Sequence, residues 1–430
     1  MRATTRPARR VVLAGSAALA LALLAATPAA HAAPRHAYRH PGSLVLVGGG
    51  LKDDNAQVYG EIIKRAGGSA ARIGVITAAS VPESQDPDAG DPDLCSNSAC
   101  NGTYYSALFE RHGAADAQWI PIDLDHLANA DDDRIVDQIN SMTGFFFGGG
   151  DQYRYITTML HGDQHKDSKA LAAIRAKLAH GAVVAGSSAG AQIASGRDMV
   201  SGGDSYEALR DGSEPGYFDD PTRLGYIPQG GFGFLRSGLI DTHTGAYGRE
   251  GRALRLAADT GHDRVYALEE NTALVVDNPG TNDERLTVLG TNGVAVLDLR
   301  RAHAHTEENG WSLRGARYTY LTDRDHYTAR TWRPQPAPDK RPLTPHDTTP
   351  VPADTDVFYS VANPDGKPYA LRTTARALAA RSQKSATATT YEDGPRFTVT
   401  LTKPRGFTAW SGAAEEPRTL IGLRIDIAPE

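Results

Sequence analysis

The chain has 430 residues, and its 45 Lys and Arg against 51 Asp and Glu give a formal net charge of −6. This acidic balance gives no electrostatic reason to expect nucleic acid as a partner. After the N-terminal segment no apolar run is long enough to span a bilayer, so we expect no membrane partner.

Residues 1–32 have the features of a secretory signal peptide. A basic start that includes Arg9 and Arg10 precedes an apolar run over residues 11–26, and an Ala-x-Ala cleavage signal follows at residues 30–32. Removing this segment takes away four arginines and no acid, so the net charge of −6 becomes −10. We expect a secreted, extracellular protein, and the arginine pair leaves both Sec and Tat export open.

The two cysteines, Cys95 and Cys100, lie in a short polar segment. An exported chain meets an oxidising compartment, so we expect these cysteines to form a disulfide that pins a loop. No Cys and His set has the spacing of a zinc site, and we expect neither a metal nor another cofactor.

Residues 44–185 alternate between two patterns. Short apolar runs typical of buried strands occupy residues 44–47, 73–78, 119–122, 145–147 and 182–185. Between them lie segments with helical spacing, near residues 58–63, 104–111 and 171–178. This alternation predicts an α/β fold with a mainly parallel sheet covered on both faces. In such a sheet the functional loops gather at the carboxyl ends of the strands.

From about residue 264 onward the pattern becomes strand-like. Residues 333–352 contain seven prolines and read as a linker. Residues 353–430 hold further β-type segments, enough for a small C-terminal domain. The predicted organisation is therefore a signal peptide (1–32), an α/β domain (42–332), a Pro-rich linker (333–352) and a small β-rich domain (353–430).

A Gly-x-Ser-x-Gly motif at residues 186–190 directly follows the predicted strand 182–185. In this context the motif indicates a nucleophile elbow, a sharp turn that exposes Ser188 above the sheet. The amides of Ser188 and Ala189, at the start of the next helix, are candidate oxyanion donors. The alternative is a turn of small residues in which Ser188 only caps a helix.

A serine nucleophile needs a base, and the base needs an orienting acid. His243 comes just after another apolar segment and is the candidate base. Asp204 and Glu207 lie between Ser188 and His243 and are the candidate acids, which gives the chain order Ser, acid, His. Either acid could instead be a solvated loop charge.

A second glycine cluster, residues 148–150, follows the strand 145–147. Glycines let backbone amides approach a ligand, so Gly149 or Gly150 is expected to supply a second oxyanion donor. Gln152 would face the same pocket. A flexible loop at a strand end is the alternative.

Taken in order, the Phe-x-Gly-Gly-Asp-Gln segment, Gly-Ser-Ser-Ala-Gly-Ala and Asp-x-His with spaced arginines resemble the cyanophycinase branch of the S51 serine peptidases. That family also contains the α-aspartyl dipeptidases. The resemblance covers roughly residues 42–332 and implies a three-layer α/β sandwich similar to class I glutamine amidotransferases. It implies Ser188 as nucleophile, His243 as base and Gln152 as a pocket residue, and it favours Glu207 over Asp204 as the acid.

The resemblance also implies a substrate-binding set around Asp241, Arg249 and Arg252. Two guanidinium groups there could bind a substrate carboxylate, and an ion pair on a helix surface is the alternative. The sequence departs from the family pattern at Thr242, where a glutamine is usual, and at Tyr247, where the first arginine is usual. These departures concern the substrate and leave the hydrolytic centre intact.

The sequence therefore predicts a secreted serine peptidase that hydrolyses aspartyl peptide or isopeptide bonds, with cyanophycin, a β-Asp-Arg polymer, as the leading substrate. An exopeptidase or amidase for other Asp or isoAsp peptides is the alternative, and a binding protein without activity is an alternative of another class. The expected partner is a peptide or polymer substrate, and a homodimer is left open.

Overall fold

The computed structural model describes residues 41–412 and 417–430. The predicted signal peptide lies outside the described residues. None of the helices within these ranges has the length and apolar character to cross a membrane. The predicted disulfide between Cys95 and Cys100 is present.

The first sheet is built around five parallel strands. In spatial order these are β1 (Ser43–Val47), β7 (Val183–Ser187), β4 (Gly144–Phe147), β2 (Arg72–Ile76) and β3 (Asp116–Trp119). Four antiparallel strands extend the sheet beyond β1, namely β13 (Thr272–Asp277), β14 (Arg285–Gly290), β18 (His326–Thr328) and β19 (Arg333–Gln335).

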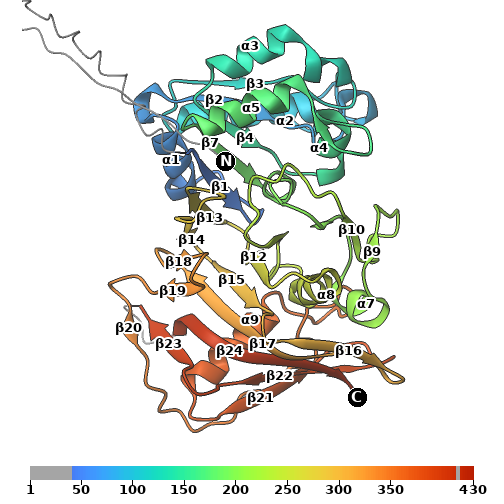
Figure 1. The fold of residues 1–430 in the computed structure, drawn as a ribbon, viewed down its shortest axis with the longest axis vertical. Coiled ribbons are helices and arrows are strands. Elements are labelled where there is room, and N and C mark those ends of the chain that lie inside the picture. Colours follow the sequence, from blue (N-terminus) through green and yellow to red (C-terminus); the bar gives the residue numbers. More distant parts are fainter. Residues whose placement is uncertain (1–40, 413–416) are drawn as a thin grey trace, which may run out of the picture. The chain divides into compact units, whose positions relative to one another are not determined.

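Helices cover both faces of the parallel strands. One layer is formed by α1 (Ala56–Arg65) and α2 (Ser98–Arg111), and the other by α3 (Asp133–Ser141), α4 (Gln152–Met159) and α5 (Lys169–Ala179). Strand β1 shows the cause: Val45 and Val47 join the core under the first layer, and Leu44 and Leu46 join the core under the second. Figure 1 shows α3 above β3. The predicted α/β fold with a mainly parallel central sheet is confirmed.

Some element bounds differ from the prediction. The third strand was expected at residues 119–122 but occupies Asp116–Trp119. Pro121 explains the shift, because it has no N–H to donate to a neighbouring strand. Helices α3 and α4 were not expected. In α3 Ile139 is the one buried apolar residue, and α4 has only eight residues.

The remaining elements before the second large sheet include the helix α8 (Glu250–Thr260), which follows His243, and several short pieces. The short pieces are η1 (Gly68–Ala70), η2 (Glu83–Gln85), η3 (Leu127–Asp131), α6 (Ala189–Gln192), α7 (Ser205–Asp211), the pair β5 (Leu160–His161) and β6 (Lys166–Asp167), and the small sheet of β8 (Met199–Val200), β10 (Gly225–Ile227) and β9 (Glu214–Pro215).

A second large sheet contains both the middle and the end of the chain. Its main path is β11 (Leu239–Thr242), β12 (Arg264–Leu268), β15 (Gly293–Asp298), β17 (Gly310–Thr322), β24 (Pro417–Pro429), β22 (Phe397–Thr402) and β21 (Ser385–Thr389). Beside this path, β16 (His303–Glu307) pairs with β17, and β20 (Arg341–Pro342) and β23 (Thr408–Ser411) complete the sheet.

We call residues 333–412 and 417–430 the C-terminal extension. It is β-rich, as predicted, and also contains helix α9 (Ala370–Ala380). It continues the sheet of the preceding residues, because β24 pairs directly with β17. The residues expected to form a linker are also bonded into the two sheets, through β19 and β20. The buried side chains of α9, Leu371, Ala375 and Leu378, share one core with those of β17 and β24.

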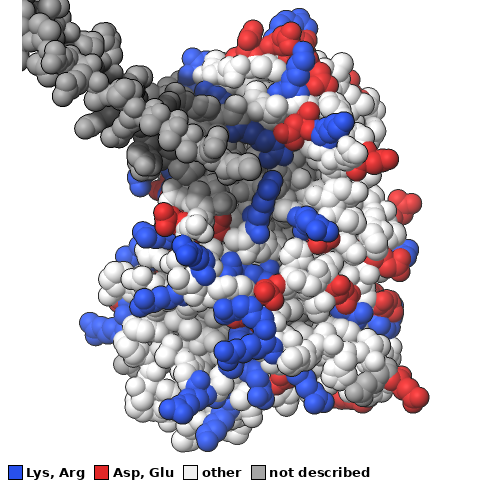
Figure 2. All heavy atoms as spheres, viewed as in Figure 1, with Lys and Arg blue, Asp and Glu red and all other residues white. Residues whose placement is uncertain are grey.

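The charge is unevenly spread over the molecule. Figure 2 shows Lys and Arg side chains gathered on the lower part of the visible face, where Figure 1 places strands of the C-terminal extension. The overall negative charge therefore does not describe every surface of the protein.

Candidate active site

Ser188 occupies a strained turn between β7 and α6. Its backbone has φ 55° and ψ −118°, a conformation that is rare outside glycine and typical of a nucleophile elbow. Gly190 makes the turn possible, because a Cβ at that position would lie 2.0 Å from the carbonyl oxygen of Phe147. The motif at residues 186–190 thus forms the predicted strand-to-helix turn.

The glycine loop after β4 lies beside this serine. A Cβ on Gly149 would lie 3.4 Å from the Cβ and 3.9 Å from the Oγ of Ser188. The amide of Ser188 itself donates to the carbonyl oxygen of Val47 at 3.0 Å, so it is not free to bind an oxyanion. Gly149, Gly150 and Ala189 remain the candidate donors.

His243 lies at the end of β11, as predicted. Its Nε2 atom is 2.7 Å from the Oγ of Ser188. Its backbone amide donates to the carbonyl oxygen of Gly48 at 2.7 Å, and its ring lies against Gly49, where a Cβ would be 2.1 Å from the ring. The ring of Tyr247 stacks on it with centroids 4.9 Å apart. The imidazole is therefore held in one orientation.

The carboxylate beside His243 belongs to Glu270. Its Oε1 atom lies 2.7 Å from Nδ1 of His243, so an N–H at Nδ1 can donate to it while Nε2 accepts from Ser188. Strand pairing explains this arrangement: β11 and β12 are parallel with Thr242 opposite Leu268, so the residues after the two strands meet at one edge. The Ser188, His243 and Glu270 side chains form a continuous hydrogen-bonded series.

The acids expected from the sequence lie elsewhere. Glu207, the favoured candidate, and Asp204 line a neighbouring cavity of about 110 Å³ that Tyr359 and Glu392 also line. Burial raises the pKa of Glu207, and the neighbouring Asp204 and Glu392 add to this rise. The carboxylate that contacts His243 is therefore that of Glu270, and not that of Glu207 or Asp204.

A signal for Glu270 was present in the sequence. It follows the apolar run at residues 265–268 in the same way that His243 follows the strand before it. Two polar residues that follow two adjacent parallel strands lie at the same sheet edge. The expected chain order of Ser, acid, His placed the acid between Ser188 and His243. That expectation was wrong, because the order here is Ser, His, Glu.

The surroundings of His243 favour its neutral form. Burial lowers its pKa, the hydrogen bond to Glu270 works against this, and the nearby positive charge of Arg249 lowers it further. A neutral imidazole at neutral pH can accept a proton from Ser188.

A hollow of about 420 Å³ opens beside Ser188 and His243. Arg249 lines it, with Nη1 donating to the carbonyl oxygen of Thr242 at 3.1 Å and the guanidinium 4.8 Å from the ring centroid of Tyr247. Burial, together with the like charge of Arg252, lowers the pKa of Arg249 to about 10. Arg249 forms no ion pair with any described residue, which leaves its charge available to an anionic group.

Arg252 lines the same hollow but is already paired. Its Nε and Nη2 atoms donate to the two carboxylate oxygens of Asp241 at 2.9 and 2.6 Å, and Nη1 donates to the carbonyl oxygen of Gly203 at 2.6 Å. Both side chains of the pair are buried. Asp241 and Arg252 therefore form an ion pair with each other, whereas the sequence predicted that both bind substrate.

Gln152 faces the hollow, as predicted. Its Nε2 atom donates to the carbonyl oxygens of Val200 and Ser201 at 3.1 and 3.4 Å. Tyr217, which the sequence did not single out, lines the same hollow and donates to Asp151 at 2.7 Å. Among the described residues, no three His, Cys, Asp or Glu side chains gather to hold a metal ion.

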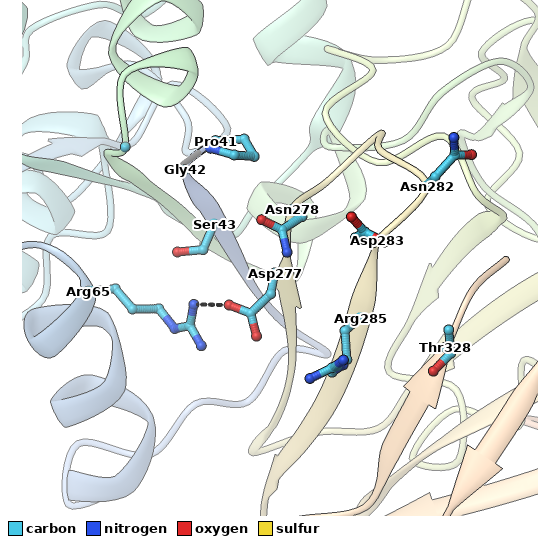
Figure 3. Close-up of a pocket in the computed structure, with 11 residues that line it drawn as sticks. Pro41, Gly42, Ser43, Arg65, Asp277, Asn278, Asn282, Asp283, Arg285 and Thr328 are labelled. Atoms are coloured by element: carbon cyan, nitrogen blue, oxygen red, sulfur yellow. Dashed lines mark hydrogen bonds and ion pairs between the residues drawn. The ribbon is translucent and has the colours of Figure 1, made fainter. Parts of the chain in front are cut away.

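A larger hollow of about 580 Å³ lies at the opposite edge of the sheet. Figure 3 shows Arg65 and Asp277 paired there, beside Ser43 at the start of β1. Ser188, by contrast, follows the carboxyl end of β7, where Ser187 pairs with Val47 at the other end of β1. The larger hollow therefore does not contain the Ser188 centre.

Comparison with known proteins agrees with the motifs. The family model described as peptidase family S51 matches residues 44–283, which include Ser188, His243 and Glu270. A cyanophycinase of Synechococcus elongatus is 28% identical over 310 residues, which cover 69% of this chain and 83% of that protein. A cyanophycinase of Thermosynechococcus vestitus matches with the same identity and coverage.

Among solved structures, the crystal structure of a peptidase from an acI-B1 Actinobacterium is similar. It has a TM-score of 0.44 and 16% identity, and the match covers 67% of this chain and 98% of that one.

Proposed function

Because the chain belongs to peptidase family S51, we propose that it is a secreted serine peptidase that hydrolyses peptide or isopeptide bonds of aspartyl residues. The observation that carries this proposal is the hydrogen-bonded series from Ser188 through His243 to Glu270, with both contacts at 2.7 Å. A series of this kind activates a serine hydroxyl for attack on a carbonyl.

In the proposed reaction, Ser188 Oγ bonds to the carbonyl carbon while His243 takes the serine proton. The amides of Ala189 and of Gly149 or Gly150 stabilise the oxyanion. Collapse of the intermediate breaks the C–N bond, and His243 gives its proton to the leaving amine. Water then attacks the acyl-enzyme with His243 again as base, which releases the acid and restores Ser188.

The preference for an aspartyl substrate rests on Arg249. Its guanidinium lines the hollow beside Ser188 and has no carboxylate partner within the described residues. A guanidinium can bind a carboxylate through two parallel N–H donors, so an acidic group next to the scissile bond would fit. Cyanophycin is the first substrate to test, since two relatives that cover most of this chain are cyanophycinases.

A second candidate is an exopeptidase or amidase that acts on other Asp or isoAsp peptides. Two observations favour it: Tyr247, half exposed, stands in the pocket where the family usually has an arginine, and Arg252 is already bound to Asp241. The pocket therefore offers fewer free guanidinium groups than the family pattern implies.

Export completes the proposal. The N-terminal sequence features support it, and so does the Cys95–Cys100 disulfide, because disulfides persist in oxidising compartments.

A direct experiment separates an enzyme from a silent binding protein. The chain lacking residues 1–32 is incubated with a fluorophosphonate, whose phosphorus bonds to an activated serine with loss of fluoride, and labelling is followed by intact-mass spectrometry. We expect labelling that Ser188→Ala abolishes. Products from cyanophycin and from short Asp and isoAsp peptides then identify the substrate class, and an unlabelled wild-type protein that cleaves none of them would overturn the proposal.

A further inference from the structure

The C-terminal extension packs directly against the segment that follows His243. The amide of Tyr369 donates to the carbonyl oxygen of Gly245 at 2.6 Å, and a Cβ on Gly245 would lie 2.2 Å from the tyrosine ring. Further along, a Cβ on Gly248 would lie 1.6 Å from the carbonyl oxygen of Phe358. The backbone after His243 therefore has no room to move toward the extension.

Helix α9 of the extension also reaches the residue beside Glu270. Nη1 of Arg372 donates to Oε2 of Glu269 at 2.5 Å and lies 3.1 Å from the hydroxyl of Tyr320. The Glu269 carboxylate also accepts from Tyr320 at 2.7 Å and from the amide of Gly293 at 3.2 Å. Glu269 is only 2% exposed, so Arg372 supplies the charge that balances a buried carboxylate.

A second route leads from the same arginine to Glu270 itself. Nη1 of Arg372 donates to Oδ1 of Asn292 at 3.2 Å, and Nδ2 of Asn292 donates to the carbonyl oxygen of Glu270 at 2.9 Å. Arg372 is thus connected to the backbone of Glu270 through Asn292 and to the preceding residue through an ion pair. One route ends at the backbone of Glu270, whose carboxylate orients His243. The other ends at the adjacent residue, Glu269.

The charges around Arg372 explain why an arginine is needed there. Burial raises the pKa of Glu269, and the positive charge of Arg372 opposes this rise. Burial also raises the pKa of Glu250, at the start of α8, to about 8, and Arg372 opposes that rise as well. Without the arginine, Glu269 would be an unpaired buried charge and would either take up a proton or turn away.

We infer that Arg372 is a positioning residue, supplied by the C-terminal extension, that holds the Glu269–Glu270 turn so that the Glu270 carboxylate stays on Nδ1 of His243. The inference rests on the proposed function of the Ser188 centre. It adds a contribution to the active site from outside residues 44–283, the part of the chain that the family model matches.

A purely structural role of Arg372 would predict lower stability with unchanged chemistry in the molecules that remain folded. A double-mutant cycle distinguishes a positioning role of Arg372 from a purely structural one. The second-order rate of fluorophosphonate labelling is measured on the chain lacking residues 1–32, at a temperature where circular dichroism shows every variant folded. Arg372→Gln should lower this rate about tenfold, because a small displacement of an orienting group is costly in rate.

The same substitution is then made in a Glu270→Gln background. If Arg372 acts through Glu270, it should cost little more there, since residues that act as a unit are not additive. Arg381→Gln is the matched control: Arg381 follows the end of α9 and pairs with Asp347, in the same extension but in a different ion pair. It should leave the labelling rate unchanged in both backgrounds.

Two further variants keep the test independent of folding losses. Arg372→Lys retains a positive charge near Glu269 and should recover part of the rate lost in Arg372→Gln. Asn292→Ala removes the second route alone and should lower the labelling rate while the Arg372–Glu269 pair remains.

The outcomes distinguish this inference from the function on which it rests. A labelled wild type with Arg372→Gln at the wild-type rate, or with a full additive loss in the Glu270→Gln background, overturns the positioning role and leaves the proposed function standing. A wild type that is neither labelled nor hydrolytic overturns both.

Discussion

The Nδ1 atom of His243 lies 2.7 Å from Oε1 of Glu270, a residue that follows the strand next to the one that ends at Thr242. The contact joins two parallel strands at their carboxyl ends. It makes the order of the three side chains Ser, His, Glu along the chain, and it assigns to Glu270 the orienting task that either Glu207 or Asp204 was expected to perform.

Replacing this carboxylate tests the assignment. Glu270→Gln should lower the fluorophosphonate labelling rate by about 100-fold or more, because an amide at this position no longer favours the tautomer with a free Nε2. Glu207→Gln is the control, since Glu207 lies in the neighbouring cavity and should leave the rate unchanged. If the two variants exchange their effects, Glu207 is the acid after all.

The pH dependence of labelling should follow His243. Its pKa lies below its ordinary value of 6.5, so the rate should fall only as the pH drops through this lowered pKa and the imidazole becomes protonated. Arg249→Met removes a positive charge that lowers the pKa, and the acidic limb should move to higher pH. Glu270→Gln removes a group that raises the pKa, and the limb should move to lower pH. If neither substitution moves the acidic limb of the pH profile, the group that titrates is not His243.

Arg249 should affect acidic substrates selectively. Arg249→Lys keeps the charge but loses the planar pair of donors, so kcat/KM for an aspartyl substrate should fall about tenfold while labelling by a neutral fluorophosphonate changes little. The comparison uses the same protein preparation for both reactions. Equal losses in both reactions would mean that Arg249 serves the chemistry of Ser188 and not recognition of the substrate.

The Asp241–Arg252 pair should matter for stability. Arg252→Met leaves the carboxylate of Asp241 buried without its partner, which should cost about 3–5 kcal/mol of unfolding free energy. The double variant with Asp241→Asn should recover part of this loss in thermal or urea unfolding, because it removes the unpaired charge. Two single losses that simply add in the double variant would contradict the pairing.

The first part of the chain was largely readable from its sequence. Short apolar strands such as residues 44–47 bury both faces, and the glycines around Ser188 allow the tight turn that the motif predicts, so local pattern and tertiary structure agree there. The strand near Trp119 shifted because one proline removed a donor. His243 was found because a strand ends directly before it.

The rest depended on pairing between distant segments, which no local pattern carries. Glu270 required knowing that β11 and β12 lie side by side. The ion pair between Arg252 and Asp241 depends on where α8 lies after it packs against β12, the strand beside β11. From the sequence alone, the same two residues could equally be substrate ligands. The extension was predicted to be a separate domain because prolines such as those at residues 333–352 are typical of linkers. In the structure this segment pairs with β18 through β19 and with β23 through β20.

The place of β24 has a consequence for how the chain is made. This strand, Pro417–Pro429, is synthesised after every other strand of its sheet, yet it lies between β17 and β22 and pairs with both. Until it emerges from the ribosome, β17 presents an open edge whose N–H and C=O groups can pair with another chain. Synthesis must therefore proceed past β24 before this sheet can close, and a chain cut short before residue 417 would leave the edge of β17 open to pairing with another chain.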